Sequence, residues 1–171
     1  MDKLTPKETS KGAEEIVLTQ IKQDFITPAN AIFDYVDMVE KVLNDAELTS
    51  EDEIAQIKSS CNHLIDQYEV AFLQNTGINA ETSKKTPEEY SELRHNLRTP
   101  LNAIIGYSEI LMEDYEDDLE ESALEDFQQI INLARETEKA IEIFVDYIRG
   151  CLLYTSPSPR DVEESRMPSS A

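Results

Sequence analysis

The sequence predicts an all-α protein in which two helical hairpins form an antiparallel four-helix bundle. Apolar residues recur at steps of three and four along most of the chain, which is the spacing of one buried helical stripe. The 171 residues include only four glycines and no tryptophan, and Glu, Ile, Leu and Ala are frequent, as is typical of helical proteins. The pattern of the first half also returns in the second half, so the bundle is expected to consist of two similar units.

The first half predicts a helix near 12–44 and a second helix near 51–74, which together form one hairpin. Ser50 and Glu53 stand three residues apart at the start of the second helix, the spacing of a capping box. Residues 1–11 are expected to be a disordered N-terminus. The expected buried stripes are Leu18, Ile21, Phe25, Ala29, Ile32, Val36, Val39 and Leu43 on the first helix, and Ile54, Ile57, Cys61, Leu64, Tyr68 and Phe72 on the second.

The second half predicts helices near 87–115 and 121–149, after a linker at 75–86 that has no apolar period. Thr86 and Glu89 again have the spacing of a capping box, and a proline follows the cap at the first helical position. The expected buried stripes are Tyr90, Leu93, Leu97, Leu101, Ile104, Ser108, Leu111 and Tyr115, then Phe127, Ile130, Ala134, Thr137, Ile141 and Val145.

The two halves are interpreted as an internal duplication. A shift of 72 residues places Pro28 on Pro100, and both prolines lie inside a predicted helix, where the missing N–H kinks or loosens the backbone. Chance hardly places two such prolines in the same surroundings. The identical pairs are Thr27 and Thr99, Pro28 and Pro100, Asn30 and Asn102, Ala31 and Ala103, Ile32 and Ile104, and Tyr35 and Tyr107.

The composition of the chain excludes some classes of binding partner. The formal net charge is −21, and such a surface repels nucleic acid phosphates and anionic lipid, so we expect no nucleic acid partner and no membrane partner. No stretch has the ~20 apolar residues that span a bilayer, and no signal peptide core is visible. The two cysteines suggest neither a disulfide framework nor a metal site, so the expected location is the cytoplasm.

The last segment, 150–171, has a different character. Two Ser-Pro steps, at Ser156 and Ser158, interrupt it, and it has no link to the apolar stripes. It is interpreted as a disordered and non-native tail, such as translated adapter sequence fused to a truncated reading frame. The alternative is a natural disordered tail. If the tail is foreign, the native protein continued past Gly150 and its downstream domains are missing.

The run from Leu93 to Glu109 (LRHNLRTPLNAIIGYSE) carries the most specific signal in the chain. His95 lies between two inward-facing leucines and therefore points to solvent, Thr99 follows one helical turn later, and Pro100 comes next. This run resembles the phosphoacceptor motif, or H-box, of bacterial sensor histidine kinases, whose dimerisation and phosphoacceptor domain is a helical hairpin. The resemblance covers the motif residue by residue through Leu111.

The resemblance implies a role for several residues of the motif. His95 would be the phosphoacceptor, since imidazole is a nucleophile near neutral pH. Arg94 and Arg98 beside it would offset the charge of the phosphate. Thr99 matches the family position that orients water for dephosphorylation of the partner. The alternative role for Thr99 is a backbone hydrogen bond at the proline.

Both halves depart from the family pattern. Asn96 stands where the family has an acid that acts as general base, and an amide cannot accept a proton, so autophosphorylation is in doubt. In the first half Asp24 keeps the acid, but Gln23 replaces the histidine, so that half is interpreted as a degenerate copy. His63 has no motif around it and is interpreted as an ordinary surface residue.

These observations predict a histidine phosphoacceptor and dimerisation module of a two-component phosphorelay. His95 would carry phosphate between an ATP-binding kinase domain, in cis or in trans, and the aspartate of a receiver (response regulator) domain. Neither an ATP-binding domain nor a P-loop is visible, so no cofactor is expected in this chain. The hairpins are expected to self-associate within one chain. The alternative is a non-catalytic helical scaffold of a larger signalling protein, for example one with a nucleotide cyclase output.

Overall fold

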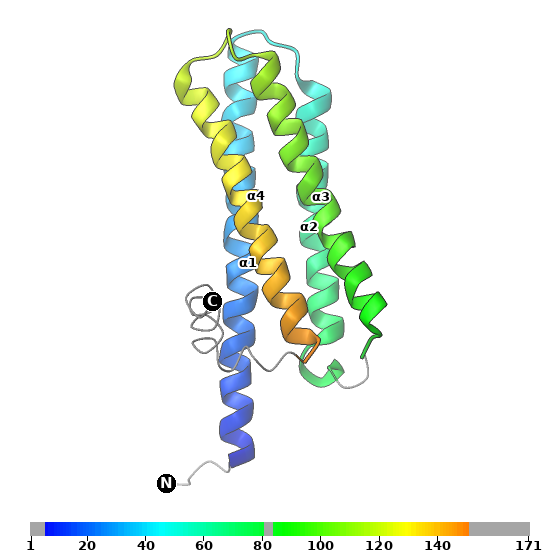
Figure 1. Cartoon of the computed structure of the whole chain (residues 1–171). Coiled ribbons are helices and arrows are strands. Elements are labelled where there is room, and N and C mark those ends of the chain that lie inside the picture. The colour runs from blue at the N-terminus through cyan, green and yellow to red at the C-terminus, as the bar shows by residue number, and fades with distance from the viewer. Residues whose placement is uncertain (1–5, 81–83, 151–171) are drawn as a thin grey trace, which may run out of the picture.

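The computed structural model describes residues 6–80 and 84–150, and within them the chain is helical with no strand. The elements in order are α1 (Pro6–Asp45), α2 (Glu51–Asn75), the short 3-10 helix η1 (Gly77–Asn79), α3 (Pro87–Asp114) and α4 (Glu121–Ile148). Figure 1 shows the four long helices side by side, with alternating direction along the bundle. The predicted all-α fold is therefore confirmed.

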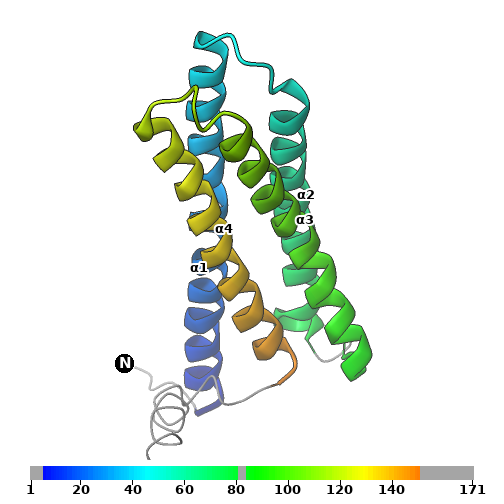
Figure 2. The same ribbon diagram turned by 45° about the horizontal axis from the view of Figure 1, so that its top comes forward.

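Each long helix packs on two others, in the order α1, α2, α3, α4 around the bundle, and α4 closes the ring against α1. The packing of α1 is more extensive on α4 than on α2, its own hairpin partner. The turns that follow α1 and α3 lie at the same end of the bundle (Figures 1 and 2). There the hydroxyl of Tyr115 donates a hydrogen bond to the carbonyl oxygen of Thr49, which ties the two turns together. The hairpins thus contact each other along their sides and at one end.

One hydrophobic core contains the apolar stripes of all four helices. Its largest fully buried side chains come from every helix and include Phe25, Tyr68, Leu97 and Phe144. Four stripe residues at the margins of the core, namely Leu18, Phe72, Leu93 and Tyr115, are only partly buried. Since each hairpin covers the stripe of the other, the single chain removes both stripes from water, and this burial is the main source of stability.

The helix ends show one correct capping prediction and one wrong prediction. At the start of α3, the Glu89 N–H donates to Thr86 Oγ1 over 3.2 Å, and the Thr86 N–H donates to Glu89 Oε1 over 2.9 Å, so the capping box is present. At the start of α2, Ser50 makes no capping hydrogen bond, with φ −150° and ψ 14°. Its side chain is buried instead, and the acidic first turn of α2 interacts favourably with the helix dipole.

The helices differ from the predicted ranges mainly at the N-terminus. The structure has α1 starting at Pro6, so residues 6–11 extend a helix that was expected to begin near residue 12. Apolar periodicity detects only the packed part of a helix, whereas Lys and Glu, which occur in this segment, continue a helix at little cost without an apolar pattern. Residues 1–5 and the predicted tail beyond Gly150 lie outside the described residues. Within the described part of the chain, every helix is too polar or too short to cross a bilayer.

Candidate functional site

His95 lies on the outer face of α3 and is exposed to solvent. Leu97, two residues later, is fully buried in the core, and a helical step of two residues turns the side chain by about 200°. The core contacts of Leu97 therefore fix the orientation of α3 and direct His95 outward. An imidazole in this position can be reached by a second protein or by a phosphate donor.

Thr99 and Pro100 follow His95 within the same helix. The hydroxyl of Thr99 donates a hydrogen bond to the carbonyl oxygen of His95 over 2.9 Å. Thr19 and Thr137 make the same bond to the carbonyl oxygen four residues before them, so it is an ordinary helical contact of threonine. Pro100 is buried and α3 continues through it. The role that the resemblance gives Thr99 in dephosphorylation stays a prediction.

The two arginines beside His95 are paired with acidic residues of α4. Arg98 Nε and Nη2 lie 2.9 Å and 2.8 Å from the same oxygen, Oε2 of Glu138. Arg94 Nε lies 3.2 Å from Glu142 Oε2, and Arg94 Nη2 lies 3.7 Å from Asp146 Oδ1. The sequence placed both arginines next to the histidine, whereas the structure uses both to join α3 to α4.

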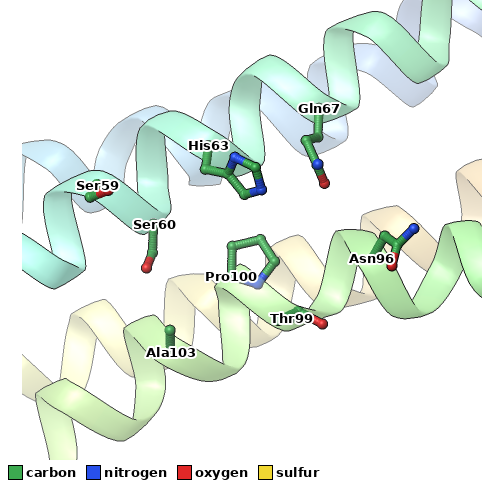
Figure 3. A pocket seen from close by; sticks show the side chains of 8 residues that line it. All are labelled: Ser59, Ser60, His63, Gln67, Asn96, Thr99, Pro100 and Ala103. Carbon is green, nitrogen blue, oxygen red and sulfur yellow. The ribbon is translucent and has the colours of Figure 1, made fainter.

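A groove lies between α2 and α3 on the other side of the motif. Figure 3 shows His63 and Gln67 of α2 extending toward the segment of α3 that carries Asn96 and Pro100. We call this the α2–α3 groove, and its lining residues are Ser59, Ser60, His63, Gln67, Asn96, Thr99, Pro100 and Ala103. His63 is exposed, but it faces the H-box, and sequence reasoning missed this because the pairing of α2 with α3 is a tertiary contact.

The corresponding region of the first hairpin has different chemistry. Gln23 is exposed on α1, and Asp24 accepts a hydrogen bond from Gln20 over 2.7 Å. The ammonium of Lys22 lies 5.4 Å from the centre of the Phe72 ring. Glutamine has no nucleophilic nitrogen comparable to imidazole, so this face offers no acceptor for a phosphoryl group.

The described residues contain no cluster of three or more His, Cys, Asp or Glu side chains that could hold a metal ion. The chemistry that the H-box offers is that of the exposed imidazole of His95, with two guanidinium groups nearby and an amide in place of an adjacent carboxylate.

Comparison with known proteins gives one positive result. No curated protein and no solved structure matches the chain significantly. Residues 88–149 match the family described as the His Kinase A (phospho-acceptor) domain. The matched residues run through α3 and α4, including His95 and its neighbours. The second hairpin is therefore similar to the phosphoacceptor domain of histidine kinases, which supports a role as a module of such a kinase.

Proposed function

We propose that this chain is a histidine phosphoacceptor module in which His95 receives a phosphoryl group from an ATP-binding kinase domain and passes it to a receiver aspartate. The observation that carries the proposal is the exposed imidazole of His95 within the segment that matches the phosphoacceptor family. A buried imidazole could not reach the γ-phosphate of ATP held by another domain, and this one lies open on the outer face of α3.

We also infer that the first hairpin is a degenerate copy of the second. It supplies the half of the core that a second phosphoacceptor hairpin would supply in a homodimer. The matching prolines, Pro28 and Pro100, and the shared core support this inference. In this arrangement one chain carries a single acceptor, because Gln23 replaces the histidine in the first hairpin.

The direct test is phosphorylation of the chain by isolated histidine kinase ATP-binding domains with radiolabelled ATP, or by phosphorylated receiver domains. The label on a phosphohistidine is acid-labile and stable in base. His95→Gln should abolish this label. His63→Gln is the matched control, because His63 is the other histidine of the chain, and it should keep the label. Label that persists in His95→Gln would show that His95 is not the acceptor.

Asn96 favours a second candidate, a helical scaffold that transmits a signal without accepting phosphate. The missing carboxylate removes the expected general base beside the imidazole. In that case neither kinase domains nor receiver domains would label the chain, whereas α1–α2 and α3–α4 would still associate. The same labelling experiment therefore distinguishes the two candidates.

A further inference from the structure

The two arginines that pair α3 with α4 differ in how exposed their side chains are. The side chain of Arg94 is 23% exposed and faces two acidic residues, Glu142 and Asp146. The side chain of Arg98 is 44% exposed and, among the described residues, contacts one oxygen of one acidic residue, Glu138. Nε and Nη2 of Arg98 approach that oxygen closely, at 2.9 Å and 2.8 Å, but solvent screens an exposed ion pair, so it contributes little to stability. Arg98 is therefore the arginine that solvent or a bound anion can reach more easily.

Arg98 is also within reach of the acceptor histidine. Helical residues three apart are neighbours on one face, with about 5–6 Å between Cβ atoms, and Arg98 follows His95 by three residues. The guanidinium group extends several bonds beyond Cβ, so a rotation of the side chain moves it from Glu138 to a group on the imidazole of His95. Both side chains are exposed to solvent.

The first hairpin shows that the positions of Arg98 and Glu138 do not need charged side chains for packing. The shift of 72 residues matches Arg98 with Ile26. The second helices of the two halves align at a shift of 73, which matches Glu138 with Ile65. Ile26 and Ile65 are partly buried and pack against the core. The hairpin that lacks the histidine thus has two apolar residues at these positions. The charged pair accompanies the histidine, which indicates a role in the chemistry of His95.

We propose that Glu138 is a positioning residue that controls whether Arg98 is available to the phosphoryl group on His95. In the free protein the carboxylate holds Arg98 on α4. A phosphoryl group on His95 carries more negative charge than a carboxylate and offers several acceptor oxygens, so it competes for the guanidinium. Transfer of Arg98 then leaves Glu138 without its partner and weakens the contact between α3 and α4 beside the site. This inference rests on the proposed function.

A chemical phosphate donor tests the proposal without a kinase. Phosphoramidate phosphorylates accessible histidines: the imidazole nitrogen attacks phosphorus, an N–P bond forms, the P–N bond of the donor breaks, ammonia leaves, and the imidazole proton passes to the buffer. A His63→Gln background leaves His95 as the only histidine. The measured quantity is the second-order rate constant for labelling of His95 in the full chain.

Glu138→Gln should raise this rate constant about 2- to 5-fold, the factor that corresponds to an exposed ion pair, because the released Arg98 attracts the anionic donor. The increase should vanish when Arg98→Gln is present as well. Glu136→Gln is the matched control, since it removes the same charge from an exposed residue of the same helix. It should give a smaller change that does not depend on Arg98.

A double variant and an NMR signal distinguish the positioning role of Glu138 from a purely structural role. The combined variant Arg98→Ile and Glu138→Ile carries the apolar pair of the first hairpin, so it should keep the thermal stability of the bundle but label as slowly as Arg98→Gln. Labelling of His95 should also shift the NMR signal of the Arg98 Nε–H. An increase in rate from Glu138→Gln that persists without Arg98, or an unchanged rate, would overturn the proposal.

The two proposals can fail separately. If kinase domains and receivers never label His95 but the phosphoramidate rates depend jointly on Arg98 and Glu138, the proposed relay function fails and the positioning role stands. If kinase domains label His95 and the rates show no joint dependence, the relay function stands and the role of Glu138 fails.

Discussion

The ring of Tyr68 lies parallel to the ring of Phe25, with 3.6 Å between the ring centroids and 5° between the planes. Phe144 of α4 packs on the same tyrosine at 4.8 Å, so the stack joins the first hairpin to the second. The matched positions of the second hairpin hold Leu97 and Ile141, which are also fully buried. The two hairpins therefore contribute side chains of different shape to one core.

Removal of the Tyr68 hydroxyl should stabilise the protein. This buried oxygen has no hydrogen-bond partner among the described residues, and burial raises the pKa of Tyr68, with a further contribution from Asp24. Because a buried hydroxyl without a partner costs about 1–3 kcal/mol, Tyr68→Phe should increase the free energy of unfolding by about 1 kcal/mol in urea titrations. Tyr68→Ala, which removes the stack, should instead cost about 3–5 kcal/mol. A clear loss of stability in Tyr68→Phe would contradict this assignment.

The chain should be a monomer at micromolar concentration. Because the two hairpins are linked, the effective concentration of each for the other is in the millimolar range, and their unlike aromatic and aliphatic surfaces favour the intrachain pair. Light scattering should give the mass of one chain, 19.5 kDa. A stable dimer mass, together with separated hairpins that do not bind each other, would restore the ordinary homodimer.

Asn96→Asp should accelerate phosphorylation of His95 by an ATP-bound kinase domain. The substitution places a carboxylate beside the imidazole, and a correctly positioned general base contributes about 10²-fold or more. Asn96 is exposed at the edge of the α2–α3 groove, so a carboxylate of similar size fits there. Initial rates of labelling measure the effect, and Asn102→Asp on the same helix is the control for added charge. An unchanged rate would mean that Asn96 does not limit the reaction.

The capping box of α3 should give the stability a dependence on pH. The pKa of Glu89 is lowered because its carboxylate accepts a hydrogen bond from the Thr86 N–H, with a further contribution from the Thr86 hydroxyl. The stabilisation is therefore fully present above the unfolded pKa, about 4.3, and is lost as the pH falls through the lower folded value. The difference in Tm between the unsubstituted protein and the Glu89→Gln variant should therefore shrink as the pH falls over this range. A difference that stays constant with pH would exclude the carboxylate as its source.

Much of the fold was predictable because apolar periodicity reports burial directly. All 28 stripe positions were expected to be buried from their spacing alone, and 24 of them are buried, among them Phe25, Leu97 and Ile141. The capping box at Thr86 was predictable for a similar reason, since its partners lie three residues apart in the same segment. Ser50 has the same local pattern, yet tertiary packing buries its side chain and no cap forms.

The sequence by itself determined the helices, their buried faces and the exposure of His95, because these depend on contacts between residues a few positions apart. Only the tertiary structure decided the partners of the site. Arg98 lies 40 positions from Glu138, and His63 faces Pro100 from another hairpin. Such contacts depend on which helices become neighbours and how each is rotated about its axis. Apolar periodicity identifies the face of each helix that turns toward the core. It does not identify which charged side chains of two neighbouring helices come together.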